Sequence, residues 1–258
     1  MQHSEINVRG CKLNVRRGGR GEPLLFLHGA QGLNGHEPGI EALTANFDVI
    51  APDHPGFGKS DLAGAVENIG DMALFYLDLL DMLALEQVHV VGQCIGGWLA
   101  LEIAIRNTAR IKSLVLVNSA GIRLKGVPRA DMFVCSEDDL LKLLFAAEGA
   151  TQWLQSWRAS PDMEDIYERN RAAAARYSWS PRLCNPKLDR WLHRIDVPTH
   201  IVWGDDERVI PRAYAVALKE RIPGATLATI SNCAHMPHIE QPQAFAGEIS
   251  KFIRSAAR

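Results

Sequence analysis

The sequence predicts an α/β fold: a mostly parallel, eight-stranded sheet flanked by helices, with a helical cap inserted after strand 6. Short apolar runs bounded by turn residues alternate with helical patterns along most of the 258 residues. This alternation is typical of a parallel sheet covered on both faces. One long stretch without an expected strand, between Val117 and Val197, interrupts the alternation. A hydrophobic content of 47% and a charged content of 22% are ordinary for a globular chain.

Most of the expected strands are continuous apolar runs, which a strand buried on both faces requires. The first two differ, because they read as a short edge hairpin around the turn at Arg9 and Gly10. The expected strands are Ile6–Val8, Lys12–Val15, Pro23–Leu27, Phe47–Pro52, Val88–Val91, Ile111–Val117, Thr199–Trp203 and Thr226–Ile230. Between them, Asp71–Leu83 places its apolar residues on one stripe and predicts an amphipathic helix.

The long interruption is helical by pattern and is expected to form the cap. Helices are predicted over Asp139–Ala147, Thr151–Trp157 and Met163–Arg176. We therefore divide the chain into a core, residues 1–121 and 193–258, and a cap, residues 122–192. Pockets in this fold lie between cap and sheet, so Trp98, Trp153 and Trp157 are candidates for an apolar substrate wall. The same tryptophans equally fit simple core and cap packing.

The segment from Val88 to Leu101 carries the strongest local signal. A β-branched strand passes through Gly92-Gln93-Cys94-Ile95-Gly96 into an apolar helical pattern. A strand that turns into a helix so abruptly needs small neighbours and places its middle residue at the tip of a tight turn. Cys94 holds that tip and is the candidate nucleophile. The alternative is a buried cysteine that only packs the turn.

Two later strand ends carry the other groups that a nucleophile needs. The acidic residues Asp205, Asp206 and Glu207 follow the seventh strand, and His235 follows the eighth. In open α/β sheets chemistry gathers at the carboxyl ends of the strands. The chain order of nucleophile, acid and histidine is the order that a hydrolase sheet of this type requires.

Five motifs together make the chain resemble the α/β-hydrolase superfamily, in the bacterial group of capped, single-domain, esterase-like enzymes. They are His28-Gly29, the run from Asp53 to Ser60, the turn at Cys94, the run from Gly204 to Pro211, and the run from Ala234 to Pro242. The resemblance covers roughly residues 22–120 and 195–256. It implies a Cys94–His235–Glu207 catalytic triad and an oxyanion hole.

The sequence departs from that family in two ways. Its usual nucleophile is serine, whereas this chain has Cys94. The usual triad acid of the family is aspartate. In this chain the spacing from Gly204 instead selects Glu207, with Asp206 as the alternative after a small loop shift.

A thiol is mostly protonated at neutral pH, so Cys94 needs His235 as its base. Attack on a carbonyl builds negative charge on oxygen. The backbone N–H groups of Ile95 and Ala30 are the expected donors to that charge. His28, His54 and His238 are expected to be structural.

The predicted site implies a small-molecule acyl substrate as the partner. Composition argues against other kinds of partner. A formal charge of −2 gives no basic surface for nucleic acid. The sequence has no signal peptide pattern and no apolar run long enough for a membrane. The five cysteines show no paired spacing, which suggests a cytoplasmic protein. We expect no cofactor, no metal, no nucleic-acid or membrane partner, and a monomer or homodimer.

The leading hypothesis is a hydrolase that cleaves an ester, lactone or similarly activated carbonyl through an acyl-cysteine. Acyl transfer, carbon–carbon bond hydrolysis and a non-hydrolytic ligand receptor are the alternatives. The serine-type surroundings of Cys94 also fit a cysteine introduced in place of serine.

Overall fold

The fold was analysed in a computed structural model, which describes residues 1–146 and 162–256. The predicted helix Thr151–Trp157, with the candidate pocket residues Trp153 and Trp157, lies outside the described residues.

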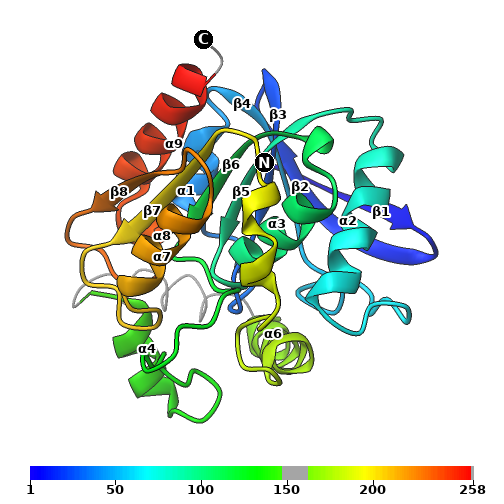
Figure 1. The fold of residues 1–258 in the computed structure, drawn as a ribbon. Coiled ribbons are helices and arrows are strands. Elements are labelled where there is room, and N and C mark those ends of the chain that lie inside the picture. Colours follow the sequence, from blue (N-terminus) through cyan, green and yellow to red (C-terminus); the bar gives the residue numbers. More distant parts are fainter. Residues whose placement is uncertain (147–161, 257–258) are drawn as a thin grey trace.

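The described residues form one eight-stranded sheet (Figure 1). Its strands are β1 (Gln2–Val8), β2 (Cys11–Gly18), β3 (Glu22–Leu27), β4 (Phe47–Pro52), β5 (Val88–Gln93), β6 (Ile111–Val117), β7 (Thr199–Gly204) and β8 (Thr226–Ile230). The spatial order is β1-β2-β4-β3-β5-β6-β7-β8. The β1–β2 and β2–β4 pairs are antiparallel and all other neighbours are parallel. This confirms the predicted mostly parallel sheet.

Helices cover both faces of the sheet, which explains the continuous apolar runs. The helices are α1 (Pro38–Leu43), α2 (Ile69–Met82), α3 (Ile95–Arg106), α4 (Glu137–Leu144), α6 (Met163–Ser178), α7 (Ala213–Arg221), α8 (Pro237–Glu240) and α9 (Pro242–Ala256). Leu25 and Leu27 of β3 join the core under α2 and α3. Leu24 and Phe26 join the separate core under α1 and α9. Alternate residues point to opposite faces, and both faces are buried.

Two predicted helices of the segment between β6 and β7 are present with shifted ends. Helix α4 begins at Glu137, because the Ser136 side chain accepts a hydrogen bond from Asp139 N at 3.2 Å and caps its first turn. Helix α6 begins at Met163 as predicted and extends to Ser178. Figure 1 shows α4 and α6 together at one end of the molecule. The division into core and cap at residues 122 and 192 stays a prediction.

Among the described residues, no helix has the length and apolar character needed to cross a bilayer.

Glycines allow β3, β5 and α3 to approach each other closely. A Cβ placed on Gly96 would lie 2.1 Å from Leu27 O, and one on Gly92 would lie 2.3 Å from Gly96 O. Both obstructing atoms belong to the backbone, so neither can move aside cheaply. The turn at Cys94 therefore depends on these two residues having no side chain.

We predict that Gly96→Ala lowers the free energy of unfolding by about 3 kcal/mol, because overpacking against a fixed backbone is costly. Gly247→Ala in α9 is the matched control. A Cβ there meets nothing within 4 Å, and replacing a helical glycine by alanine gains up to about 1 kcal/mol. Urea unfolding of both variants measures the difference. Equal stability of the two variants would show that the close approach at Gly96 is not needed.

Candidate active site

Cys94 sits between β5 and α3 in a strained backbone conformation. Its φ is 53° and its ψ is −115°, in the region that favours glycine. Hydrogen bonds fix it there, since Cys94 N donates to Val117 O at 3.0 Å and Cys94 O accepts from Ala120 N at 3.0 Å. The carbonyl also accepts from the first turn of α3. The predicted sharp turn is therefore present, and the neighbouring strand and helix hold its tip.

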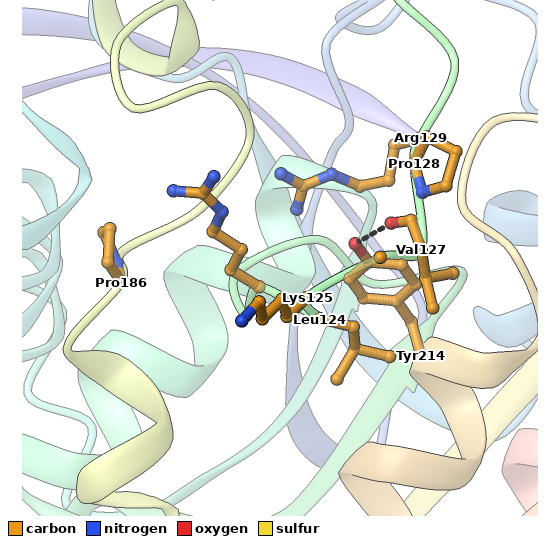
Figure 2. Close-up of a pocket in the computed structure, with 9 residues that line it drawn as sticks. Leu124, Lys125, Val127, Pro128, Arg129, Pro186 and Tyr214 are labelled. Carbon is orange, nitrogen blue, oxygen red and sulfur yellow. Dashed lines mark hydrogen bonds between the residues drawn. The ribbon is translucent and has the colours of Figure 1, made fainter.

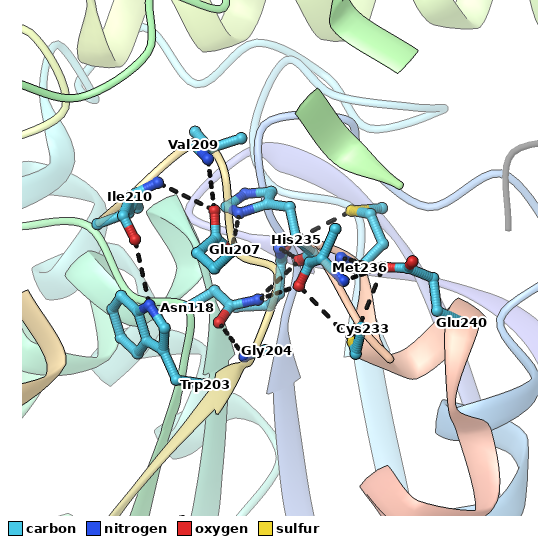
Figure 3. A network of polar contacts seen from close by, with 12 residues as sticks. Asn118, Trp203, Gly204, Glu207, Val209, Ile210, Cys233, His235, Met236 and Glu240 are labelled. Carbon is cyan, nitrogen blue, oxygen red and sulfur yellow. Dashed lines mark hydrogen bonds and ion pairs between the residues drawn. The ribbon is translucent and has the colours of Figure 1, made fainter. Parts of the chain in front are cut away.

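His235 and Glu207 lie in the loops after β8 and β7 and face each other (Figure 3). Glu207 Oε2 lies 2.8 Å from His235 Nδ1. Both side chains, like Cys94, are at most 2% exposed. The three predicted groups are thus brought together in a dry part of the protein, where an unscreened ion pair is strong.

The loop conformation decides which acidic side chain faces His235. Glu207 Oε1 accepts hydrogen bonds from Val209 N at 2.6 Å and Ile210 N at 2.9 Å. These bonds leave Oε2 for the histidine. Asp206 instead points outward, where it forms a half-exposed ion pair with Arg208.

The environment favours a protonated His235. Burial by itself lowers the pKa of an imidazole, but the negative charge of Glu207 and the nearby Cys94 sulfur, with hydrogen bonds to both, outweigh it. Together they raise the pKa of His235 from 6.5 to about 10. At neutral pH the imidazole therefore holds a proton between a carboxylate and a sulfur.

Two backbone N–H groups beside Cys94 have no acceptor among the described residues. They are Ile95 N, in the first turn of α3, and Ala30 N, in the loop after β3. That loop passes close to the nucleophile, since a Cβ on Gly29 would lie 3.1 Å from Cys94 Cβ. Free N–H groups at this position are what a developing oxyanion requires.

A buried histidine pair holds the loop that contains Ala30. His54 N donates to His28 Nε2 at 2.9 Å, so the other ring nitrogen of His28 carries the proton and donates to Gly29 O at 2.8 Å. The His54 ring donates to His28 O at 3.0 Å and therefore accepts from Tyr76 Oη at 2.5 Å. Burial lowers the pKa of both rings, to about 3 for His28. The predicted structural role of these histidines agrees with this arrangement.

Sequence reasoning missed two amides that hold the His235 loop. Gln93 Nε2 donates to His235 O at 3.0 Å. Asn118 Nδ2 donates to Ala234 O at 3.0 Å and to His235 O at 3.2 Å, while its Oδ1 accepts from Gly204 N at 3.0 Å (Figure 3). Their signal was available, because Gln93 ends β5 and Asn118 directly follows β6, two polar residues at strand ends.

Helices α4 and α6 also contact the catalytic loops. Leu144 O, at the end of α4, accepts a hydrogen bond from His235 N at 3.0 Å. Asn170 of α6 donates to Gln31 O at 2.8 Å and accepts from Gly58 N at 2.8 Å, joining the loops after β3 and β4. The described part of the segment between β6 and β7 therefore helps to fix the loops around Cys94.

Trp98 and a second buried cysteine occupy less reactive positions. Trp98 is 5% exposed and its indole N–H donates to the buried Glu102 at 3.0 Å, which places it in the core behind the turn. Its role in a substrate wall stays a prediction. Cys233 is buried beside Glu240, and burial with the nearby negative charge raises the pKa of its thiol far above the ordinary value.

The model of the "alpha/beta hydrolase fold" family matches residues 22–242, most of the chain. The chain belongs to this family. It is a hydrolase of the α/β fold.

Curated relatives support the same assignment across nearly the whole chain. A 2-hydroxymuconate semialdehyde hydrolase from Pseudomonas sp. (strain CF600) is 27% identical over 98% of this chain and 94% of its own length. A putative carbamate hydrolase from Azorhizobium caulinodans is 28% identical over 88% of this chain and 89% of its own.

Solved structures resemble the chain in fold. An esterase from Rhodococcus sp. ECU1013 has a TM-score of 0.80 at 22% identity. The match covers 99% of this chain and 100% of the esterase chain. A meta-cleavage product hydrolase from Pseudomonas fluorescens IP01 has a TM-score of 0.78 at 24% identity and covers 98% of each chain.

We predict that buried neutral histidines make the protein less stable as the pH falls from about 6.5 to 5. The pKa of His28 and of His238 is lowered to about 3 by burial, whereas in the unfolded chain both titrate near 6.5. Below pH 6.5 the unfolded state therefore binds protons that the folded state does not, and stability is lost. His235 affects stability in the opposite direction. Its raised pKa stabilises the folded state at low pH, and this stabilisation is lost only as the pH rises through about 10.

The measurement is urea unfolding at pH 7, 6 and 5 for the parent and for His238→Leu. The His238 ring packs between Phe26 and Phe245, so leucine suits the site. The parent's loss of stability should exceed the variant's by up to about 1.4 kcal/mol per pH unit. Identical slopes would contradict the assignment of a neutral His238.

Proposed function

We propose that the protein hydrolyses a carboxylic ester, lactone or similarly activated carbonyl through a covalent acyl-cysteine at Cys94. One observation carries the proposal. Cys94, His235 and Glu207 are buried together, with Glu207 2.8 Å from His235 and the histidine pKa raised by both neighbours. A nucleophile, a proton carrier and an orienting acid in this order are the parts that acyl transfer needs.

In the first step the Cys94 thiol passes its proton to His235 Nε2, the sulfur attacks the substrate carbonyl carbon and an S–C bond forms. The carbonyl oxygen becomes negative and receives hydrogen bonds from Ile95 N and Ala30 N. The carbonyl re-forms, the bond to the leaving oxygen breaks, and His235 Nε2 gives its proton to that oxygen. Because the raised pKa of His235 favours its protonated form, the proton taken from Cys94 stays on the imidazole until the leaving oxygen accepts it.

In the second step water attacks the thioester. His235, now neutral, accepts a proton from the water, and the S–C bond breaks to release the acid. Glu207 keeps the imidazole in one orientation throughout, because its own position is fixed by Val209 N and Ile210 N.

Carbon–carbon bond hydrolysis is the second candidate. The observation that favours it is the similarity to 2-hydroxymuconate semialdehyde hydrolases, at 27% and 28% identity over 98% of this chain. Turnover of 2-hydroxymuconate semialdehyde by the same preparation that is assayed with aryl acetates distinguishes the two candidates. Acyl transfer stays a third, since a dihydrolipoyllysine-residue acetyltransferase component from Cupriavidus necator is 28% identical over 96% of this chain.

We predict that the parent hydrolyses aryl acetates with a transient acetyl adduct on Cys94, seen by intact mass during turnover. Cys94→Ser should be slower, because His235 is tuned to a sulfur. Cys94→Ala should lose at least ~10³-fold in rate and form no adduct.

If Cys94→Ser hydrolyses the ester much faster and the parent stalls as acyl-enzyme, cysteine is a poor substitute for serine at this position. No adduct and no turnover in parent and serine variant, across several esters and lactones, would overturn the ester-hydrolase proposal.

We predict that Glu207→Gln lowers kcat/KM by about 10³–10⁴-fold, because the amide no longer holds or stabilises the imidazolium. It should also shift the pH–rate profile, since the pKa of His235 loses one of the charges that raise it. Asp206→Asn is the matched control, one residue away and half-exposed, and should stay within about threefold of the parent. Equal losses of kcat/KM in the two variants would contradict the assignment of Glu207 as the triad acid.

A further inference from the structure

A pocket of about 690 Å³ lies between the loop that follows β6 and helix α7 (Figure 2). Residues 123–129 form most of its wall, with Pro186 and Tyr214 completing it. Its volume falls in the range of small-molecule sites. Cys94, Glu207 and His235 do not line this pocket, and the reaction proposed above does not use it.

Only positive charges line this pocket. Arg123, Lys125 and Arg129 all contribute side chains, and the described lining has no acidic residue. Arg123 and Lys125 are exposed, and neither forms an ion pair within the described residues. Asp131, in the same loop, is already paired with Arg182. A cluster of three cations in a chain of net charge −2 attracts an anion.

Arg129 is held rigidly at the pocket by neutral groups. Its Nη1 donates to Ile122 O at 2.9 Å and to Leu183 O at 3.1 Å, and its Nη2 donates to Arg182 O at 2.6 Å. Carbonyl oxygens orient the guanidinium without neutralising it. The positive charge is therefore fixed in place before any ligand arrives, which reduces the entropy lost on binding.

The rest of the wall is apolar, and the Tyr214 ring, which is 1% exposed, supports it from behind. The Arg129 guanidinium carbon lies 5.3 Å from the centroid of the Tyr214 ring. The Tyr214 hydroxyl donates to Val127 O at 2.8 Å, which fixes the ring and uses its polar group (Figure 2). Leu124 and Pro128 add further apolar surface. We propose that this pocket binds an organic anion, a carboxylate or phosphate ester carried on an apolar body.

The test is isothermal titration calorimetry of the full chain with phenyl phosphate as the anionic probe and phenol as its uncharged counterpart. The double variant Arg123→Ala/Lys125→Ala should bind phenyl phosphate at least tenfold more weakly than the parent. Arg123→Lys/Lys125→Arg should retain the affinity. Arg129 is left in place, because its carbonyl bonds hold the loop together.

The matched control is Lys251→Ala/Arg254→Ala, which removes the same charge from exposed positions on α9. It should bind phenyl phosphate as the parent does. Circular dichroism and thermal unfolding verify that each variant is folded. No binding to the parent, equal binding by both alanine pairs, or equal affinity for phenol would each overturn the proposal. Because no variant alters Cys94, His235 or Glu207, this outcome is independent of whether the protein hydrolyses esters.

Discussion

The 2.8 Å contact between Glu207 and His235 is the interaction on which the rest of the site depends. A buried imidazolium is stable only beside negative charge, and Glu207 supplies it. Glu207 must in turn be held by backbone donors from Val209 and Ile210. The ends of β5, β7 and β8 therefore have to stay in register for any one of these side chains to remain buried.

The backbone around the pair is fixed by amides and glycines more than by apolar packing. Asn118 joins the end of β6 to β7 and to the His235 loop through three hydrogen bonds. Gly96 allows α3 to lie against β3. His28 and His54 anchor the neighbouring loop as neutral rings, because burial lowers their pKa. Polar groups with complete sets of partners give a site a single geometry.

The segment between β6 and β7 is tied to both halves of the site. Helix α4 accepts a hydrogen bond from His235 N through Leu144 O, and α6 joins two loops through Asn170. A substitution that breaks these hydrogen bonds would therefore move the loops that follow β3, β4 and β8.

The sequence by itself determined what local chemistry dictates. It predicted the six later strands from their continuous apolar runs and the first two from the turn at Arg9 and Gly10. It also predicted the turn at Cys94, because so tight a turn needs Gly92 and Gly96. It also predicted which loops carry Glu207 and His235. It did not decide between Glu207 and Asp206, since adjacent residues in one loop differ only in the direction in which the folded backbone points them. The contacts of Asn118, Asn170 and Arg129 likewise depended on tertiary structure, because each joins segments far apart in the chain.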